Sequence, residues 1–337
     1  MVSGWQYLKI PQFDLESPLH MKWRKIGKIF DPTKFELPNN CKEFAQSPQT
    51  LVFDDFIRVY FSTRERDRTS KFLSRIAFAD FDKQFDVIRV SSEPVIDLGK
   101  LGCYDEHGIF PLNIFRVKTQ ILGYIGGWSR RVSVSVDGSI GLAVSEDEGR
   151  TFQKIGDGPV LTSSLNEPFL IGDPCVKAYD GIFHMWYIFG KRWKKYSSDI
   201  PPERIYKIGH AVSLDGIVWD KKEEGQQIIG DKLNADESQA LPTVIKIGDR
   251  YHMFFCYRQS SDFRKAKNRS YRIGYAFSDD LLNWARDDED AGIDVTEGAW
   301  DSEMLCYPHA FGMDGEIYLM YNGNEFGRYG FGLASLM

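Results

Sequence analysis

The sequence predicts an all-β chain folded as a five-bladed β-propeller, and three series of recurring segments predict it. The first series is a strand of the type Gly-x-Ala-x-Ser, with its alanine at Ala77, Ala143, Ala211, Ala276 and Ala334. The second series is a proline that enters an apolar run, at Pro48, Pro111, Pro174, Pro242 and Pro308. The third is an aromatic strand between the other two, over 56–64, 120–128, 182–190, 250–258 and 316–324. Because the three series keep one order along the chain, each repeat is one structural unit.

Each unit is expected to hold four strands. The first three are the proline segment, the aromatic segment and the alanine segment, all rich in alternating, aromatic and β-branched residues. Asp-Gly or Gly-Asp turns separate the first two in AYDGIF, IGDRY and GMDGEIY, which is typical of hairpins. A fourth strand is expected over 85–96, 152–161 and 219–229.

The fifth unit stops at Met337 without a fourth strand. The segment WRKIGKIFDP, residues 23–32, resembles the fourth strand FQKIGDGPVL of the second unit. We therefore expect this N-terminal strand to close the last blade, which would leave no open sheet edge. Residues 1–20 would form an arm, and residues 21–337 a single domain. Two stacked β-sandwiches are the alternative, but the in-phase repeat argues against them.

Composition excludes several functional classes. The net charge is −6, which argues against a general nucleic-acid binder. No apolar stretch reaches the roughly 18 residues that a membrane span needs, and the N-terminus has no apolar signal core, so we expect a cytoplasmic protein. The five cysteines are scattered without a CxxC pair and indicate free thiols. No metal or cofactor motif is present, and we expect neither.

The segment LIGDPCV, residues 170–176, places one carboxylate in an apolar run. An ionised carboxylate is rarely buried without a partner, because its desolvation costs too much. Asp173 is therefore either a turn residue ahead of Pro174 or a functional group.

The five repeats, the Asp-Pro of the third unit and the ending YNGNEFGRYGFGLA (321–334) resemble glycoside hydrolase families 43, 32 and 130, over about residues 40–337. The resemblance implies carboxylates at the mouth of a central channel, where the first strands begin. It implies that Asp173 tunes the acid or holds sugar hydroxyls, and that Glu237 is the general acid. The chain departs from the family pattern before Pro48, where FAQSPQ has no aspartate.

Glycoside hydrolysis uses two carboxyl groups on either side of the bond that breaks. The best substitutes for the missing aspartate are Asp105, with Glu106 beside it, and the pair Asp301 and Glu303. We expect Asp173, Glu237 and Asp105 to be catalytic and Glu303 to bind substrate. A glutamate stands five residues before the proline in four units, which also has a structural interpretation; these are Glu43, Glu106, Glu237 and Glu303.

Cations follow the second strand of four units, and we expect one from each, Arg64, Arg130, Arg192 and Arg258, to hold an anion. Arginine forks suit carboxylates and phosphates, although loop charges are often simply solvated. Trp128 and Tyr321 could stack on a sugar or pack at the rim. His107 is expected to contact substrate, with a structural imidazole as the alternative.

These observations predict a glycosidase-like enzyme for an acidic or phosphorylated saccharide, in surface-polysaccharide metabolism. A family 130-like phosphorylase that uses inorganic phosphate is the first alternative, because it needs no second catalytic carboxylate. A glycan-binding propeller without activity is the second. The sequence makes no prediction about oligomeric state.

Overall fold

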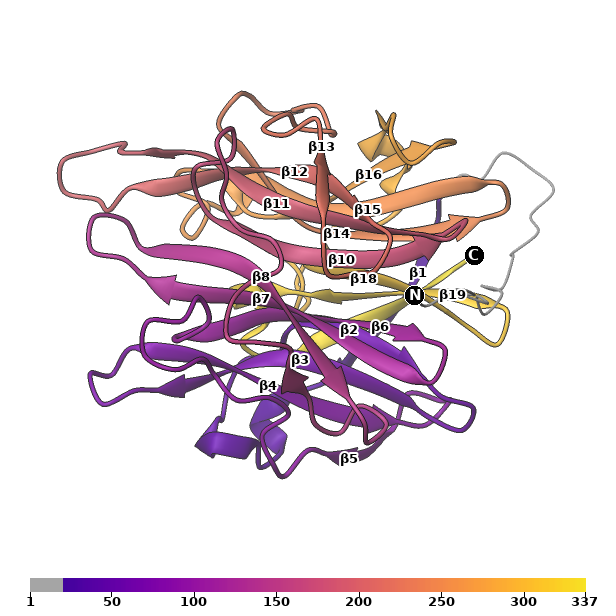
Figure 1. Cartoon of the computed structure of the whole chain (residues 1–337). Coiled ribbons are helices and arrows are strands. Elements are labelled where there is room, and N and C mark those ends of the chain that lie inside the picture. Colours follow the sequence, from indigo (N-terminus) through magenta and orange to yellow (C-terminus); the bar gives the residue numbers. More distant parts are fainter. Residues whose placement is uncertain (1–20) are drawn as a thin grey trace.

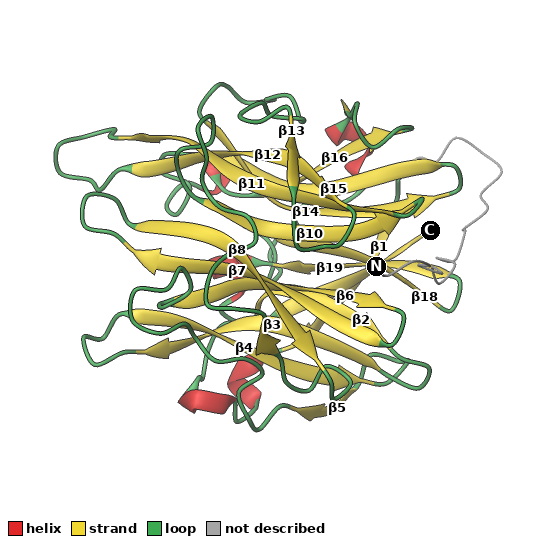
Figure 2. Ribbon diagram, in the orientation of Figure 1, coloured by secondary structure: helices red, strands yellow, loops and turns green. Residues whose placement is uncertain are grey.

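The computed structural model describes residues 21–337, and the expected arm over residues 1–20 lies outside the described residues. The described part is nearly all β (Figures 1 and 2), with strands β1 to β20 and only short helical turns. The one α-helical turn in this part is α1 (Asn324–Gly327), and 3₁₀ turns lie at Pro32–Lys34, Pro38–Asn40, Lys267–Arg269 and Asp288–Ala291. The strands within each group below pair antiparallel, as expected from hairpin-connected repeats.

Four strands form each of the first two groups. Group 1 contains β2 (Gln46–Val52), β3 (Ile57–Arg66), β4 (Phe72–Phe81) and β5 (Val87–Val90). Group 2 contains β6 (Gly108–Val117), β7 (Gln120–Arg130), β8 (Val136–Ser145) and β9 (Gln153–Lys154). A single parallel bridge between Ser74 and Gly108 joins the two groups into one eight-stranded sheet.

The next two groups are separate four-stranded sheets. Group 3 contains β10 (Ile171–Tyr179), β11 (Ile182–Lys194), β12 (Glu203–Ser213) and β13 (Asp220–Lys222). Group 4 contains β14 (Glu237–Ile247), β15 (Arg250–Gln259), β16 (Arg272–Ser278) and β17 (Ala285–Arg286).

The last sheet is built from both ends of the described chain. Group 5 contains β18 (Cys306–Met313), β19 (Glu316–Asn322), β20 (Phe331–Leu336) and β1 (Trp23–Phe30). β1 pairs antiparallel with β20 from Trp23 opposite Leu336 to Phe30 opposite Phe331. In Figure 1 the indigo β1 lies near the yellow strands of this group. The expected pairing of residues 23–32 with the last unit is therefore present.

The alanine series marks the third strand of every group. Each of these alanines is fully buried, and each lies opposite a residue of the second strand. Large side chains of neighbouring sheets then pack in five hydrophobic clusters among the described residues. The clusters join neighbouring groups, with members such as Ile76 and Leu112 (groups 1 and 2), Tyr124 and Val176 (2 and 3), Trp186 and Val244 (3 and 4), Phe254 and Ile317 (4 and 5), and Phe331 and Phe61 (5 and 1). The cluster of groups 3 and 4 also includes Cys306 and Tyr307 of group 5.

The first strands of neighbouring groups are also linked by hydrogen bonds. Each bond joins a side chain of one group to a backbone or side-chain atom of the next. They are Asn113 Nδ2 to Gln49 Oε1 (2.8 Å), Val176 N to Asn113 Oδ1 (2.9 Å), Leu241 N to Asp173 Oδ2 (3.2 Å), Ala310 N to Thr243 Oγ1 (3.1 Å) and Thr50 N to His309 Nε2 (3.1 Å). Asp173 thus provides the link between groups 3 and 4.

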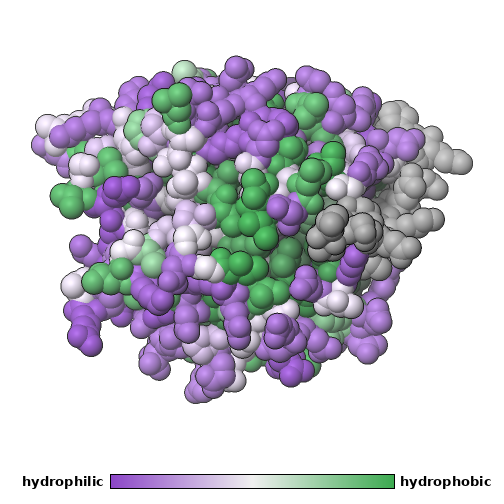
Figure 3. All heavy atoms as spheres, in the orientation of Figure 1, coloured by the Kyte–Doolittle hydropathy of each residue, from purple (hydrophilic) through white to green (hydrophobic). Residues whose placement is uncertain are grey.

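Within the described residues, no helix combines the length and apolar character that crossing a membrane requires. One face of the molecule is mostly hydrophilic, with hydrophobic residues gathered near its middle (Figure 3).

Candidate functional site

The site is built on the residue that precedes the proline of each first strand. The pairing register shifts around the proline in all five first strands, because proline has no N–H for the ladder and bulges accommodate it. The preceding residues are Ser47, Phe110, Asp173, Leu241 and Tyr307. Four of them have φ between 45° and 58°, and Phe110 precedes a cis proline bond. A left-handed backbone is uncommon for such residues, so the fold holds this position in an unusual geometry.

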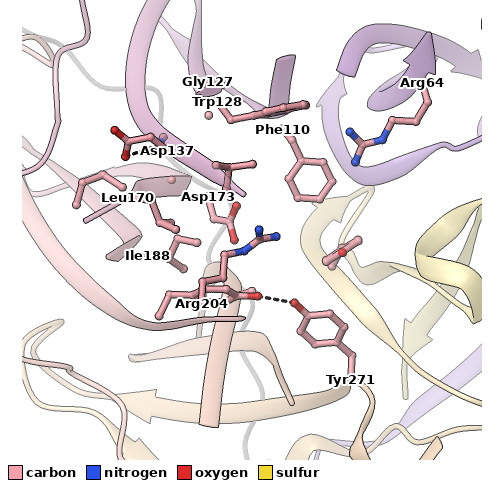
Figure 4. A pocket seen from close by; sticks show the side chains of 18 residues that line it. Arg64, Phe110, Gly127, Trp128, Asp137, Leu170, Asp173, Ile188, Arg204 and Tyr271 are labelled. Carbon is pink, nitrogen blue, oxygen red and sulfur yellow. Dashed lines mark hydrogen bonds between the residues drawn. The ribbon is translucent and has the colours of Figure 1, made fainter. Parts of the chain in front are cut away.

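Three of these residues, Phe110, Asp173 and Tyr307, line one cavity of about 270 Å³, which we call the Asp173 cavity (Figure 4). They come from three different sheets, and the bulge presents all three to the same space. Further aromatic side chains in the wall are Trp128, Tyr206 and Tyr271, beside aliphatic residues and glycines. A wall of apolar and aromatic residues with a few polar groups is typical of a small-molecule site.

Asp173 is the buried carboxyl group of this cavity. Its side chain is 7% exposed, and its Oδ2 accepts a hydrogen bond from Leu241 N at 3.2 Å. It forms no ion pair among the described residues. Burial raises the pKa of Asp173 to about 7, although the Leu241 N–H and the charge of Arg204 oppose this shift. The group can therefore carry a proton near neutral pH.

Two guanidinium groups line the same cavity, from Arg64 at the end of β3 and Arg204 at the start of β12. Arg64 Nε donates to Gln46 Oε1 at 2.9 Å, and its NH1 donates to Ser74 Oγ. Burial lowers the pKa of Arg64 to about 10. Neither arginine forms an ion pair with a carboxylate of the described residues. Such unpaired cations in a low-dielectric cavity favour an anionic ligand.

A second carboxyl group, Asp137 at the start of β8, also lines the Asp173 cavity. Its Oδ1 accepts from Gly138 N at 3.0 Å, and its Oδ2 pairs with Arg131. In contrast to Asp173, this carboxylate has a cationic partner.

Arg258 supports the wall from behind. It is nearly fully buried, and its NH2 donates to Tyr206 Oη at 3.1 Å. The hydroxyl groups of Tyr206 and Tyr271 lie 2.7 Å apart. The Arg258 guanidinium also lies 3.5 Å from the ring centre of Phe263. Arg258 thus orients two aromatic residues of the cavity without lining it.

The structure brings three of the predicted site residues to the cavity: Asp173, Arg64 and Trp128. Glu237 and Asp105 do not line it. Glu237 is fully buried against Arg286 at 2.6 Å and also accepts from two backbone N–H groups. Asp105 is buried against Lys154 at 2.5 Å. Both carboxylates have a local cationic partner, which explains why they can lie inside the protein away from the cavity.

The other predicted binding residues also lie outside the lining of the Asp173 cavity. Their local partners are as follows: Arg130 pairs with Asp67 (2.6 Å), Arg192 with Asp236 (2.5 Å) and Glu303 with Lys267 (2.8 Å), Tyr321 Oη donates to Asp301 Oδ2 (3.3 Å), and His107 Nδ1 accepts from Arg130 N (3.4 Å). His107 also stacks on Trp128, with 6.1 Å between ring centres.

The glutamates that precede the prolines each have a local partner. Glu43 pairs with Arg328 at 2.8 Å, and Glu106 accepts from Gly102 N at 3.0 Å. The partners of Glu237 and Glu303 are cationic, a guanidinium and an ammonium group. These contacts favour the structural interpretation of the series.

The lining residues that were not predicted from the sequence include Arg204, Asp137, Phe110 and Tyr307. A signal exists for the last two, because they occupy the position of Asp173 in their own repeats. They were missed because only carboxylates were considered at the position before the proline of each unit. Arg204 and Asp137 lie at the start of third strands, whereas the predicted cations come from the loops after second strands.

No group of three or more His, Cys, Asp or Glu side chains in the described part of the chain is arranged to hold a metal ion.

Known proteins resemble this chain in sequence and in fold. No protein-family model matches the chain. Two uncharacterized proteins of Mycobacterium tuberculosis, MT1551 of strain CDC 1551 / Oshkosh and Rv1502 of strain ATCC 25618 / H37Rv, are each 33% identical over 317 residues, which is 94% of this chain and 99% of theirs.

Solved structures share the fold at low sequence identity. One described as a glycoside hydrolase has a TM-score of 0.71 at 18% identity and covers 94% of this chain and 92% of its own. A second structure has a TM-score of 0.66 at 14% identity and covers 98% of this chain and 96% of its own. Its description states that the GH130 family of mannoside phosphorylases contains glycoside hydrolases that target β-1,2 mannosidic linkages in Candida mannan. A thermostable family 43 glycoside hydrolase has a TM-score of 0.59 at 15% identity, covering 87% and 88%. At the level of fold, the resemblance to this superfamily is confirmed.

Proposed function

Since this chain belongs to the same protein family as the uncharacterized Mycobacterium tuberculosis proteins MT1551 and Rv1502, we propose its function from its own cavity. We propose a five-bladed β-propeller enzyme that cleaves a glycosidic bond in an acidic saccharide, with Asp173 as the proton donor. The five strand groups are the blades, β1 closes the last one, and residues 21–337 form one domain. The five clusters between neighbouring groups support this arrangement.

The observation that carries the proposal is that one cavity combines Asp173 with Arg64 and Arg204, two arginines without an ion pair among the described residues. Breaking a glycosidic bond requires a proton on the leaving oxygen, and an acid with a pKa near the working pH is best suited to deliver it. Burial raises the pKa of Asp173 to about 7. The buried backbone of β10 and β14 holds the carboxyl group in place through the Leu241 N–H. Asp173 therefore has the protonation and the rigidity that a general acid needs.

The arginines define the class of saccharide. Arg64 and Arg204 would hold a carboxylate or phosphate group of the ligand, because a desolvated cation gains most from an opposite charge. The aromatic wall would contact the apolar faces of the sugar ring. One solved structure with this fold, described as a BT0996 RGII complex, has a TM-score of 0.68 at 18% identity, which supports a saccharide ligand for the cavity. A role in surface-polysaccharide metabolism in the cytoplasm is part of the proposal.

The second participant in the reaction separates two versions. In hydrolysis, Asp137 is the carboxylate of the cavity that can act opposite Asp173. In phosphorolysis, inorganic phosphate takes that role, and Arg64 and Arg204 would hold it. The second version is favoured by the absence of an aspartate before Pro48 in the sequence and by the pairing of Asp137 with Arg131. A glycan-binding propeller without turnover keeps the same cavity and is the third version.

One experiment tests the proposal and separates its versions. The full chain is incubated with a library of acidic oligosaccharides, with and without inorganic phosphate, and products are identified by mass spectrometry. We expect cleavage that Asp173→Asn abolishes and that Asp249→Asn, a change in an exposed turn, leaves unchanged. A sugar 1-phosphate formed only with phosphate assigns phosphorolysis. Full turnover in Asp173→Asn would contradict the proposal, and tight binding without any product would leave the glycan-binding version.

A further inference from the structure

The Asp173 cavity has a neighbouring cavity on the other side of Arg64. The second cavity, of about 520 Å³, lies beyond this side chain, and Arg64 lines both. We call it the Arg66 cavity. The guanidinium carbon of Arg64 lies 5.9 Å from the ring centre of Phe110, in the wall of the first cavity, and 6.0 Å from that of Phe44, in the wall of the second. Arg64 therefore stands at the boundary between the two spaces.

The Arg66 cavity has an excess of positive charge. Four cationic side chains and two carboxylates line it: Lys42, Arg64, Arg66, Arg328, Glu43 and Glu65. Both carboxylates are engaged, Glu43 with Arg328 at 2.8 Å and Glu65 with Arg75 at 2.7 Å. Lys42, Arg64 and Arg66 have no carboxylate partner among the described residues.

Two buried polar atoms of this cavity also lack hydrogen-bond partners within the described part of the chain. They are Asn39 Oδ1 and Arg328 Nε. Buried polar atoms are nearly always hydrogen-bonded in native proteins. Because Asn39 and Arg328 both line the Arg66 cavity, their unmet hydrogen bonds fit a polar ligand in this part of the structure.

We propose that the Arg66 cavity is a second anion subsite of the same ligand site. The ligand is then an acidic saccharide of at least two residues, with one negative group between Arg64 and Arg204 and another beside Lys42 and Arg66. This inference rests on the proposed function for the first residue. The Asp173 cavity alone is smaller than the roughly 300–1,000 Å³ that is usual for ligand sites, whereas both cavities together fall within that range.

Selenate, a small anion that is visible by anomalous scattering, tests both subsites at once. Crystals of the full chain soaked in sodium selenate are expected to hold one anion in each cavity. Selenate in the Asp173 cavity with the Arg66 cavity empty would overturn the second subsite and leave the proposed function intact. Selenate in the Arg66 cavity alone would contradict the anion site of the proposed function and the shared ligand. Both cavities empty would contradict both proposals.

Matched variants connect the subsite to the ligand. Lys42→Gln/Arg66→Gln removes two exposed cations and is expected to lose selenate from the Arg66 cavity only. Arg68→Gln, an exposed change in the turn after β3 at a residue that lines neither cavity, should keep both anions. In a panel of acidic mono- and disaccharides measured by calorimetry, a doubly charged disaccharide should bind at least about tenfold more tightly than a singly charged sugar, as one added ion pair allows. Equal affinities, or an advantage that survives in the double variant, would overturn the inference.

Discussion

Asp173 and Glu237 are buried carboxyl groups at the first strands of neighbouring sheets, but their surroundings differ. Glu237 has an ion pair with Arg286 and two backbone N–H donors. Asp173 has one backbone donor and no ion pair among the described residues, and its pKa is raised to about 7. A carboxylate that serves the fold is compensated by its own protein. We propose that Asp173, in contrast, is left open to a ligand because it acts in the reaction, and that the single Leu241 N–H donor fixes its position.

The largest expected effect is on Asp173. Asp173→Asn should lower turnover by about 10²- to 10⁴-fold, the usual contribution of a general acid. The free energy of unfolding should hardly change, because the amide oxygen can still accept from Leu241 N–H and no ion pair is lost. Product formation and urea denaturation measure the two quantities. A variant that unfolds easily but keeps its specific activity would assign Asp173 to the fold.

Glu237→Gln should show the opposite pattern. The amide removes the negative charge of residue 237 beside Arg286, which keeps its ion pair with Asp288 at 2.9 Å. Breaking a buried ion pair is strongly destabilising, and we expect a loss of about 2–3 kcal/mol, since one partner remains. Urea denaturation measures this loss, and turnover of the folded variant should stay near that of the wild type. A drop in turnover without loss of stability would indicate that Glu237 is catalytic.

The arginines allow the same comparison with cations. Arg64→Met should weaken ligand affinity by about 10- to 100-fold, the effect of one or two units of 1.4 kcal/mol, without destabilising the fold, because Arg64 has no acidic partner among the described residues. Arg286→Met should destabilise the fold, since it removes the guanidinium that pairs with both Glu237 and Asp288, and should not change affinity. Calorimetry and denaturation of both variants separate the two outcomes. If Arg64→Met lowered stability as much as Arg286→Met, Arg64 would be structural.

The smallest expected effect is the fall in kcat/KM when the pH is raised by one unit above the pKa of Asp173. A general acid acts only while protonated, and Asp173 loses its proton as pH rises through its pKa of about 7. We expect kcat/KM to be level below this value and to fall about tenfold per pH unit above it. The pH at which activity falls is diagnostic, because an enzyme whose acid was an unshifted aspartate would lose activity already above about pH 4. A pH–rate profile that stays level to about pH 9, two units above that pKa, would exclude Asp173 as the acid.

Much of the fold could be predicted because the repeated segments have strand-forming patterns that can be recognised from neighbouring residues in the sequence. In each of the five units, the proline interrupts the ladder of the first strand, and the alanine is fully buried in the third strand. The pairing of β1 with β20 was also predictable, because residues 23–32 have a fourth-strand pattern and the last unit lacks such a strand.

The site was less predictable because the ion-pair partners of charged residues lie far away in the sequence. Glu237 is compensated by Arg286, which lies 49 positions later in the chain, and Asp105 by Lys154. The value of Arg64 lies in the lack of such a partner in the described part of the chain, which only the arrangement in space reveals. The aromatic residues before Pro111 and Pro308 were visible in the sequence, but their common position mattered more than their residue type.

The pairing of β1 with β20 has a consequence for how the protein is made. A ribosome adds about 5–20 residues per second, so β1 leaves it long before its partner exists. Groups 1 to 4 can assemble during synthesis, whereas group 5 must wait until Phe331–Leu336 has emerged. Until then β1 presents an unpaired edge, the kind of surface that promotes aggregation. Synthesis of β1 and completion of its sheet are thus separated in time, and β1 stays without its partner strand until β20 has been made.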